Sequence, residues 1–372
     1  MENMGMTAII NGNIIFEDRV EKGTVLFEDG KIIAASADTT VPEHAHVIDA
    51  EGLYVSPGFV DIHCHGSGEH WFFDHPSEAA KAHLKFGTTS MLASLWRNAG
   101  AYSYVKAVEN VNRAMEEPGS NIVGIHMEGP YLDPDYGCEG GNAWPCRKEE
   151  YEEIMRTGGS HIKTWCFDPM QEGTWEFAEK CHENGIRLSV CYSKAKPELL
   201  EKLLPLGLSI GNHILCGSGE PETMFVGTRE PGSDVFNLVR DEITTEVIAD
   251  SLGGHVRPYW LKLIYKVKGA DRIALVSDCC AGGDTKGSDV NVINGELYGS
   301  RLTLSVAVKN MLHHTGAPLY EVIRMASLTP ARAIGIDSNA GSIAPGKDAD
   351  LVLLDETLSV KGVFKGGMHI KQ

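Results

Sequence analysis

Two histidines, His63 and His65, stand two residues apart, which is a common spacing for paired metal ligands on a strand. In a β-strand, side chains at positions i and i+2 point to the same side, so both imidazoles can reach one ion while Cys64 faces away. Pro57-Gly58-Phe59 precedes the pair and Gly66-Ser67-Gly68 follows it, as expected where a strand runs into a loop. We therefore expect a divalent metal here, the alternative being two histidines that merely end a strand.

Three further candidate ligands, Glu128, His213 and Asp278, each end an apolar, strand-like run. Imidazoles combined with a bridging and a terminal carboxylate suit zinc or iron, or manganese where there are more oxygen donors. The alternatives are a solvated turn glutamate, a core histidine with its hydrogen bonds satisfied, and an aspartate that caps a helix. Because all three residues fall at strand ends, we expect them to join the histidine pair.

Such a ligand set has a definite chemical use. A divalent ion lowers the pKa of a bound water to about 7 and polarises a carbonyl placed beside it. An aspartate on the same ion can accept the water's proton and return it to a leaving amine. The residues therefore indicate metal-assisted hydrolysis.

The elements that must position these residues alternate along the middle of the chain. Residues 59–336 alternate short apolar strands with helix-length amphipathic stretches, which favours a (β/α)₈ barrel over a doubly wound sheet. Barrel enzymes build their sites at the C-terminal ends of the strands, where the candidate ligands fall. Short strands with turn signals at both chain ends predict one small β-sandwich of residues 1–56 and 340–372, with residues 57–339 forming the catalytic barrel.

Composition excludes several classes of partner. The net charge of -18 argues against nucleic acid and anionic membranes, because a phosphate surface would meet a repulsive field. No apolar stretch approaches the roughly 18 residues of a membrane span. The 9 cysteines show no regular CxxC pairs and are expected to be reduced thiols. We expect a cytoplasmic protein that acts on a small molecule.

Several motifs resemble those of a known family. PGFVDIHCHG, HMEGP, ADSLGGHVRP, ALVSD and the closing GSIAPGKDADLVLLD occur in the order typical of the amidohydrolase superfamily and, within it, of the N-acetylglucosamine-6-phosphate deacetylase family. The resemblance covers essentially the whole chain. It implies a TIM barrel with a β-sandwich from both termini, a divalent metal centre, hydrolysis of an acetamido sugar phosphate, and a homodimer.

The resemblance also implies roles for individual residues. His63 and His65 match the first metal pair, Glu128 the bridging carboxylate, His213 a later metal ligand, and Asp278 the general acid and base as well as a ligand. The resemblance therefore implies that this chain retains the residues with which the family binds its metal and transfers protons.

Two further residues match substrate contacts of the family. His255 matches the histidine that touches the substrate and polarises the scissile carbonyl, although by itself it would be taken for a surface loop residue. Arg229 matches an arginine that reaches the phosphate bound by the neighbouring subunit, although by itself it would be taken for a solvated charge.

Departures from the family pattern concern the second metal position and substrate recognition. Tyr192 stands where a Gly-His-Ser segment usually supplies a metal-binding histidine, and a phenol with a pKa of about 10 is a poor zinc ligand. We therefore expect one ion per chain, most simply zinc, with Tyr192 a doubtful ligand. Cys216 and Gly217 replace part of an asparagine-alanine-methionine segment that helps to hold the sugar phosphate, and residues 136–142 lack a histidine often found there.

The sequence thus predicts a metal-dependent hydrolase that removes the acetyl group from an N-acetyl amino-sugar phosphate. One alternative is an amidohydrolase that cleaves a different amide or a cyclic imide without a phosphate. Another alternative is a non-catalytic protein of the same family that a metal stabilises. This alternative is favoured by Tyr192, which stands where the family has a metal-binding histidine.

Overall fold

The computed structural model describes residues 5–96, 104–136, 145–282, 288–293 and 295–371. The larger part of the protein is a barrel of parallel strands whose order around the sheet follows their order along the chain. These strands are β6 (Phe59–Asp61), β9 (Thr88–Trp96), β10 (Ile122–Glu128), β11 (Ile162–Phe167), β12 (Arg187–Val190), β13 (Leu208–Gly211), β14 (Thr244–Val247) and β15 (Ile273–Leu275). The expected (β/α)₈ barrel is confirmed.

The barrel strands are apolar because both of their faces are buried. In β9, every residue except the last, Trp96, is buried between the barrel interior and the surrounding helices. The first and last strands meet just beyond their C-terminal ends, where the backbone N–H of Asp278 donates to the carbonyl of His63 at 2.9 Å. This bond brings two of the candidate ligands together at the mouth of the barrel.

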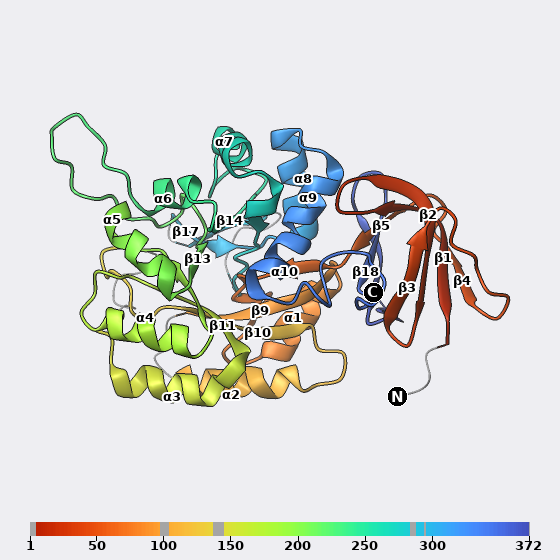
Figure 1. Ribbon diagram of the computed structural model, residues 1–372, viewed down its shortest axis with the longest axis horizontal. Helices are drawn as coiled ribbons and strands as arrows, with labels where there is room; N and C mark the ends of the chain where they lie inside the picture. The colour runs from red at the N-terminus through yellow and green to blue at the C-terminus, as the bar shows by residue number, and fades with distance from the viewer. Residues whose placement is uncertain (1–4, 97–103, 137–144, 283–287, 294, 372) are drawn as a thin grey trace.

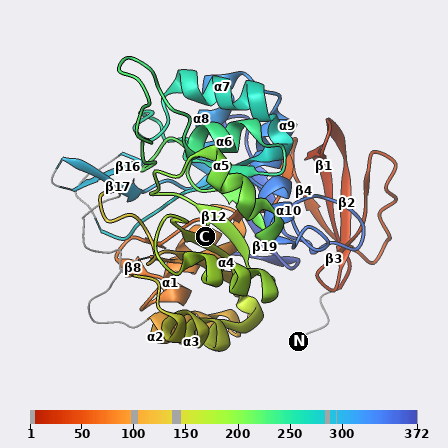
Figure 2. The ribbon, with the colours of Figure 1, turned by 60° about the vertical axis from the view of Figure 1, so that its left-hand side comes forward.

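Helices cover the outside of the barrel (Figures 1 and 2). In α2 (Tyr104–Met115), buried residues recur every three or four positions, so that one face of the helix packs inward. The other helices are α1 (Pro76–Leu84), α3 (Lys148–Gly158), α4 (Thr174–Glu183), α5 (Pro197–Leu200), α6 (Ser233–Val239), α7 (Pro258–Lys268), α8 (Leu304–Thr315), α9 (Leu319–Met325) and α10 (Leu328–Ile334), with short 3₁₀ turns η1 (Gly159–His161), η2 (Glu201–Leu206) and η3 (Ala270–Arg272). None of the helices in the described ranges is long and apolar enough to cross a membrane.

Strands from both ends of the chain form one mixed sheet beside the barrel. The strands are β1 (Thr7–Ile15), β2 (Val20–Glu28), β3 (Lys31–Ser36), β4 (His46–Asp49), β5 (Tyr54–Pro57), β18 (Leu351–Leu354), β19 (Val360–Lys365) and β20 (Met368–His369). The N-terminal and C-terminal halves join where β18 pairs antiparallel with β5, and Figure 1 shows these red and blue strands side by side.

Strand β18 also links this small sheet to the barrel. Leu351 and Leu353 pack into the core of the small sheet, whereas Val352 and Leu354 pack into a core shared with barrel residues such as Phe59. Alternate residues of a strand point to opposite faces, so one strand serves both cores.

Two hairpins lie outside the barrel sheet and the small sheet. The first pairs β7 (Gly66–Ser67) with β8 (His70–Trp71), directly after His65. The second pairs β16 (Val290–Ile293) with β17 (Glu296–Ser300) and lies on the side of the barrel away from the small sheet (Figure 2). Both hairpins follow the C-terminal end of a barrel strand, so both are placed to border the candidate site.

Candidate metal centre

The histidine pair and Glu128 converge on one point at the mouth of the barrel. His63 and His65 follow the end of β6, are buried, and bring their Nε2 atoms within 3.2 Å of each other. Glu128, the last residue of β10, places Oε1 3.5 Å from Nε2 of His63 and Oε2 3.3 Å from Nε2 of His65. Donor atoms at these separations can share one ion with bonds of about 2.0–2.2 Å.

Asp278 completes this group from the other end of the barrel sheet. Its Oδ1 lies 3.2 Å from Nε2 of His65 and 3.8 Å from Nε2 of His63. Asp278 has a φ of 48°, in the left-handed region that side chains other than glycine rarely adopt. Its backbone is held there by bonds to His63 and to Ser300, the last residue of β17. Strain that the surrounding structure holds in place is typical of functional positions.

Glu246 on β14 is a buried acid that sequence reasoning did not single out. Its Oε2 lies 2.9 Å from Nδ1 of His63 and accepts the backbone N–H of His213 at 3.1 Å. Because a carboxylate can only accept here, the Nδ1 of His63 carries the proton and its Nε2 is free to bind an ion. An acid inside the short, β-branched segment Thr244–Val247 was the available signal, but this segment was not recognised as a barrel strand.

His213 also contacts Glu128, and its ring lies 5.2 Å from that of His63. Its Nδ1 is 2.9 Å from the carbonyl of Cys216, and its Nε2 is 2.9 Å from Oε1 of Glu128. The hydroxyl of Tyr192 is 3.2 Å from the same Nε2. Burial and the nearby charge of Glu128 raise the pKa of Tyr192 well above its ordinary value, so the phenol stays protonated.

Cys216 and Gly217, both predicted to contact substrate, shape the surroundings of His213 and Tyr192. The carbonyl of Cys216 orients the imidazole of His213. Gly217 has a φ of 70°, and a Cβ added to it would lie 2.3 Å from Cε1 of Tyr192. The chain therefore needs glycine at this position both for its backbone conformation and for the close approach of the tyrosine ring.

His255 lies in the loop after β14 and is oriented by an acid. Asp250 accepts the backbone N–H of His255 at 2.9 Å and bonds its Nδ1 at 3.0 Å. Within the described ranges, the buried Nε2 of His255 has no hydrogen-bond partner, and so no bond joins it to the metal-binding group. This nitrogen is thus left for a ligand.

Arg229 is not brought to the metal-binding group within the described part of this chain. Arg229 is exposed on the long loop between β13 and α6, which projects from the barrel at the upper left of Figure 1. The predicted loss of a substrate histidine concerns residues 136–142, and beyond Tyr136 that segment lies outside the described residues.

Comparisons with known proteins agree with this geometry. The model of the Amidohydrolase family matches residues 264–369. An N-acetylglucosamine-6-phosphate deacetylase of Lysinibacillus sphaericus is 28% identical to this chain, over 94% of this chain and 93% of that protein. An N-acetylgalactosamine-6-phosphate deacetylase of Escherichia coli O157:H7 is 26% identical, over 88% of this chain and 90% of that protein.

A solved structure extends the likeness to the whole fold. The N-acetylglucosamine-6-phosphate deacetylase of Pasteurella multocida superimposes with a TM-score of 0.87 and 26% identity, covering 99% of this chain and 100% of that one. The chain thus resembles proteins of the amidohydrolase superfamily along its whole length. It is therefore an enzyme that hydrolyses carbon–nitrogen amide bonds.

Electrostatics in this amidohydrolase favour a cation at the centre. Burial opposes a charge on His63, but the carboxylates of Glu246 and Glu128 raise its pKa well above the ordinary value. Burial likewise opposes a charge on Glu128, but His63 and His213 lower its pKa well below the ordinary value. The carboxylates thus attract positive charge, and a divalent ion can supply that charge in place of protons on the imidazoles.

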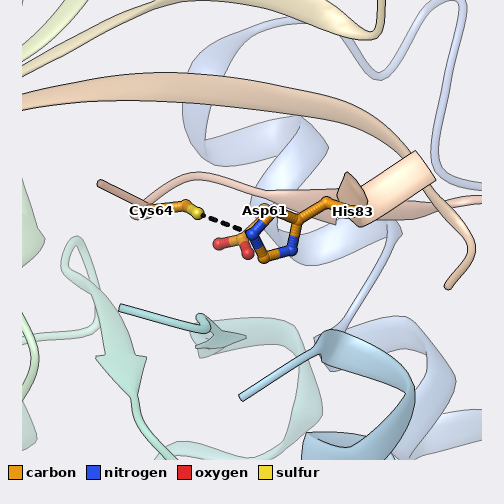
Figure 3. Close-up of side chains that lie close together, drawn as sticks. All are labelled: Asp61, Cys64 and His83. Carbon is orange, nitrogen blue, oxygen red and sulfur yellow. Dashed lines mark hydrogen bonds between the residues drawn. The ribbon is translucent and has the colours of Figure 1, made fainter. Parts of the chain in front are cut away.

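A second group of possible ligands consists of Asp61 and Cys64, at and just after the end of β6, and His83 on α1 (Figure 3). Nε2 of His83 is 3.3 Å from Sγ of Cys64 and 3.0 Å from the carbonyl of Gly66. A carbonyl only accepts hydrogen bonds, so this nitrogen carries a proton and cannot bind an ion. The group instead fastens the end of β6 to α1.

Aromatic rings border the metal-binding group of the amidohydrolase on the side of His65. The ring of Trp96, at the end of β9, lies 5.3 Å from that of His65 and 5.4 Å from that of Tyr298 on β17. Trp71 on β8 lies 6.2 Å from Trp96 and 6.4 Å from Tyr298. These three rings, Trp71, Trp96 and Tyr298, form an aromatic cluster contributed by both hairpins and a barrel strand.

Proposed function

We propose that this amidohydrolase removes the acetyl group from an N-acetyl amino-sugar phosphate. The observation that carries the proposal is the convergence of four side chains, in which Nε2 of each histidine lies 3.2–3.8 Å from donor atoms of the other three residues; the four are His63, His65, Glu128 and Asp278. The deacetylases of Lysinibacillus sphaericus and Escherichia coli O157:H7, similar over most of this chain, support the choice of an acetamido sugar phosphate.

We propose zinc as the ion, because two imidazole nitrogens and carboxylate oxygens are a common zinc ligand set, with iron and manganese as alternatives. When bound, such an ion lowers the pKa of water to about 7 and polarises the acetyl carbonyl. The set of His63, His65, Glu128 and Asp278 is complete without Tyr192, so the hydrolysis itself needs a single ion.

Asp278 is the proton carrier of the proposed reaction. Its carboxylate takes a proton from the attacking water and returns it to the amine nitrogen as the carbon–nitrogen bond breaks. The products are acetate and the free amino sugar phosphate, so one water is consumed in each turnover.

His255 positions the carbonyl in the proposed reaction. Asp250 holds its Nδ1, which leaves Nε2 facing the substrate. When both ring nitrogens carry a proton, Nδ1 of His255 donates to Asp250 and Nε2 donates a hydrogen bond to the acetyl oxygen, which stabilises the negative charge that develops there.

We propose a homodimer in which Arg229 of each chain binds the phosphate in the partner's site. The loop that carries Arg229 exposes three apolar residues at its tip, Met224 at 73%, Phe225 at 67% and Val226 at 105%. Contiguous exposed apolar residues are typical of a protein interface. A cytoplasmic location is supported by the described cysteines, which are all free thiols.

Release of acetate tests the proposal. The zinc-loaded enzyme is expected to release acetate from the 6-phosphates of N-acetylglucosamine or N-acetylgalactosamine, and much less from the unphosphorylated sugars. Absence of acetate from every phosphorylated sugar in the panel would rule the proposal out.

A second candidate is hydrolysis of an amide or cyclic imide that carries no phosphate. The aromatic cluster favours it, because flat apolar rings beside His65 suit an uncharged substrate. Arg229→Ala separates the two candidates: it is expected to raise KM strongly for a phosphorylated substrate and to leave KM for an unphosphorylated one unchanged.

A further inference from the structure

A third group of possible ligands adjoins the group proposed for catalysis. Glu128, Cys191 and His213 place one donor atom each within 4.8 Å of one another, and all three side chains are buried. Within this group, Oε1 of Glu128 lies 2.9 Å from Nε2 of His213. Glu128 is thus shared between two groups of possible ligands.

While no cation is present, burial, the neighbouring Cys166 and the charge of Glu128 raise the pKa of the Cys191 thiol well above its ordinary value, and the hydrogen bond from Asn212 acts in the opposite direction. Nδ2 of Asn212 donates to Sγ of Cys191 at 3.2 Å and to Oε1 of Glu128 at 3.1 Å. One amide therefore orients both donor atoms, as partners of metal ligands commonly do. Sγ of Cys166, from the neighbouring strand β11, lies 2.9 Å from Sγ of Cys191.

Cys191 is a better metal donor than Tyr192, which follows it in the chain. A thiol ordinarily has a pKa of about 8.5 and a phenol one of about 10, and thiolates are among the usual zinc ligands. Cys191 occupies the glycine position of the Gly-His-Ser segment typical of the family, next to the histidine position that is tyrosine here. The chain therefore gains a sulfur donor beside the position where it lacks an imidazole.

We propose that Glu128, Cys191 and His213 form a second metal position, in which Cys191 binds a soft divalent ion such as zinc as a thiolate. The thiol proton passes to solvent when the ion binds, and no electron is transferred. A thiolate favours zinc over magnesium or manganese, so this position selects the metal more strongly than the first. It replaces the expectation of one ion, which rested on Tyr192 alone. The inference rests on the proposed function only in that both use Glu128.

Cobalt substitution tests this position directly. The protein is stripped with a chelator, reloaded with Co²⁺, and examined for ions per chain and for thiolate-to-cobalt charge-transfer absorption in the near ultraviolet. Wild-type protein is expected to hold two ions and to show the absorption. Cys191→Ser is expected to hold one ion and to lose the absorption. Cys181→Ser, which changes a buried thiol on α4, is the matched control and keeps both.

Several outcomes overturn the inference. One ion per wild-type chain without the absorption excludes the second position, and absorption that persists in Cys191→Ser excludes Cys191 as its donor. If Cys191→Ser does not fold, X-ray absorption of the cobalt-loaded wild type decides, since only nitrogen and oxygen around cobalt contradicts the proposal. Loss of acetate release with the absorption intact would count against the proposed function alone.

Discussion

Glu246 holds two parts of the candidate site through one oxygen atom. Its Oε2 is bonded both to the imidazole of His63 and to the backbone of His213. Replacement by leucine removes both bonds and is expected to weaken metal affinity about 10-fold to 100-fold. Replacement by glutamine leaves an oxygen in the same place and is expected to cost much less.

Competition with a metal indicator measures these affinities. Both Glu246 variants are to be compared with wild type at one pH, because ligand protonation competes with the ion. Equal affinity for wild type and Glu246→Leu would mean that Glu246 does not position the site.

Gly217 tests how tightly Tyr192 is packed against the site. Gly217→Ala adds a Cβ 2.3 Å from the Tyr192 ring at a φ of 70°, whereas Gly185→Ala adds one in open space at the same φ. Both variants carry the same backbone cost, so the difference reports the contact. Gly217→Ala is expected to lower the free energy of unfolding by about 1–3 kcal/mol more than Gly185→Ala. Equal values in urea unfolding would show that the ring moves aside freely.

Some residues of the candidate site could be predicted from the sequence, and others could not. His63, His65, Glu128 and Asp278 were predicted as one group because each ends a strand, and the structure places their side chains together, while their roles stay predictions. Glu246 and Cys191 were missed. Their partners come from other strands, so their contribution depends on strand register, which a pattern of residue types does not supply.

At the scale of elements, Lys268 joins the ends of two helices. The last residue of α7, it donates to the carbonyl of Asn237 in α6 at 2.9 Å and to that of Arg240 just after α6 at 2.7 Å. These bonds satisfy carbonyl groups that the end of a helix leaves without partners. Burial lowers the pKa of Lys268 from 10.5 to about 8.

This shift predicts a pH dependence of stability with a definite sign. Between pH 8 and 10.5, the unfolded chain binds more protons at Lys268 than the folded chain does. The contribution of Lys268 to the free energy of unfolding therefore increases with pH across this window. Urea unfolding at several pH values is expected to show this increment in wild type and not in Lys268→Met. If the free energy of unfolding changed with pH in the same way in wild type and in Lys268→Met, the prediction would be wrong.

Some elements escaped prediction for local reasons. Asn11-Gly12 is a typical turn sequence and Asn11 has a φ of 58°, but the chain continues there as one strand, β1, with a register shift. A bulge and a turn use the same residues, and only the pairing partner distinguishes them. The β16–β17 hairpin was missed although Val290-Asn291-Val292 alternates and an Asn-Gly pair, typical of a hairpin turn, follows Ile293 in the sequence.

At the scale of the whole molecule, the small sheet and the barrel share a core through β18. Leu354 is 1% exposed and packs among barrel residues. All 6 tryptophans lie in residues 57–339, so their fluorescence reports on the barrel alone. Leu354→Ala is expected to lower the free energy of unfolding by about 2–5 kcal/mol, seen by tryptophan fluorescence.

The matched control for this shared core is Ile33→Ala, at a 43% exposed position of β3, which is expected to change the transition little. An unchanged fluorescence transition in Leu354→Ala would show that the barrel unfolds independently of the small sheet.

The central claim is that a metal centre with Asp278 as its proton carrier hydrolyses an acetamido group. Its most direct test is acetate release from N-acetylglucosamine-6-phosphate or N-acetylgalactosamine-6-phosphate by wild type and Asp278→Asn at measured metal content. The variant is expected to keep its fold and at least one ion per chain, and to lose turnover by at least about 100-fold. Turnover equal to wild type in a metal-loaded Asp278→Asn would contradict the account.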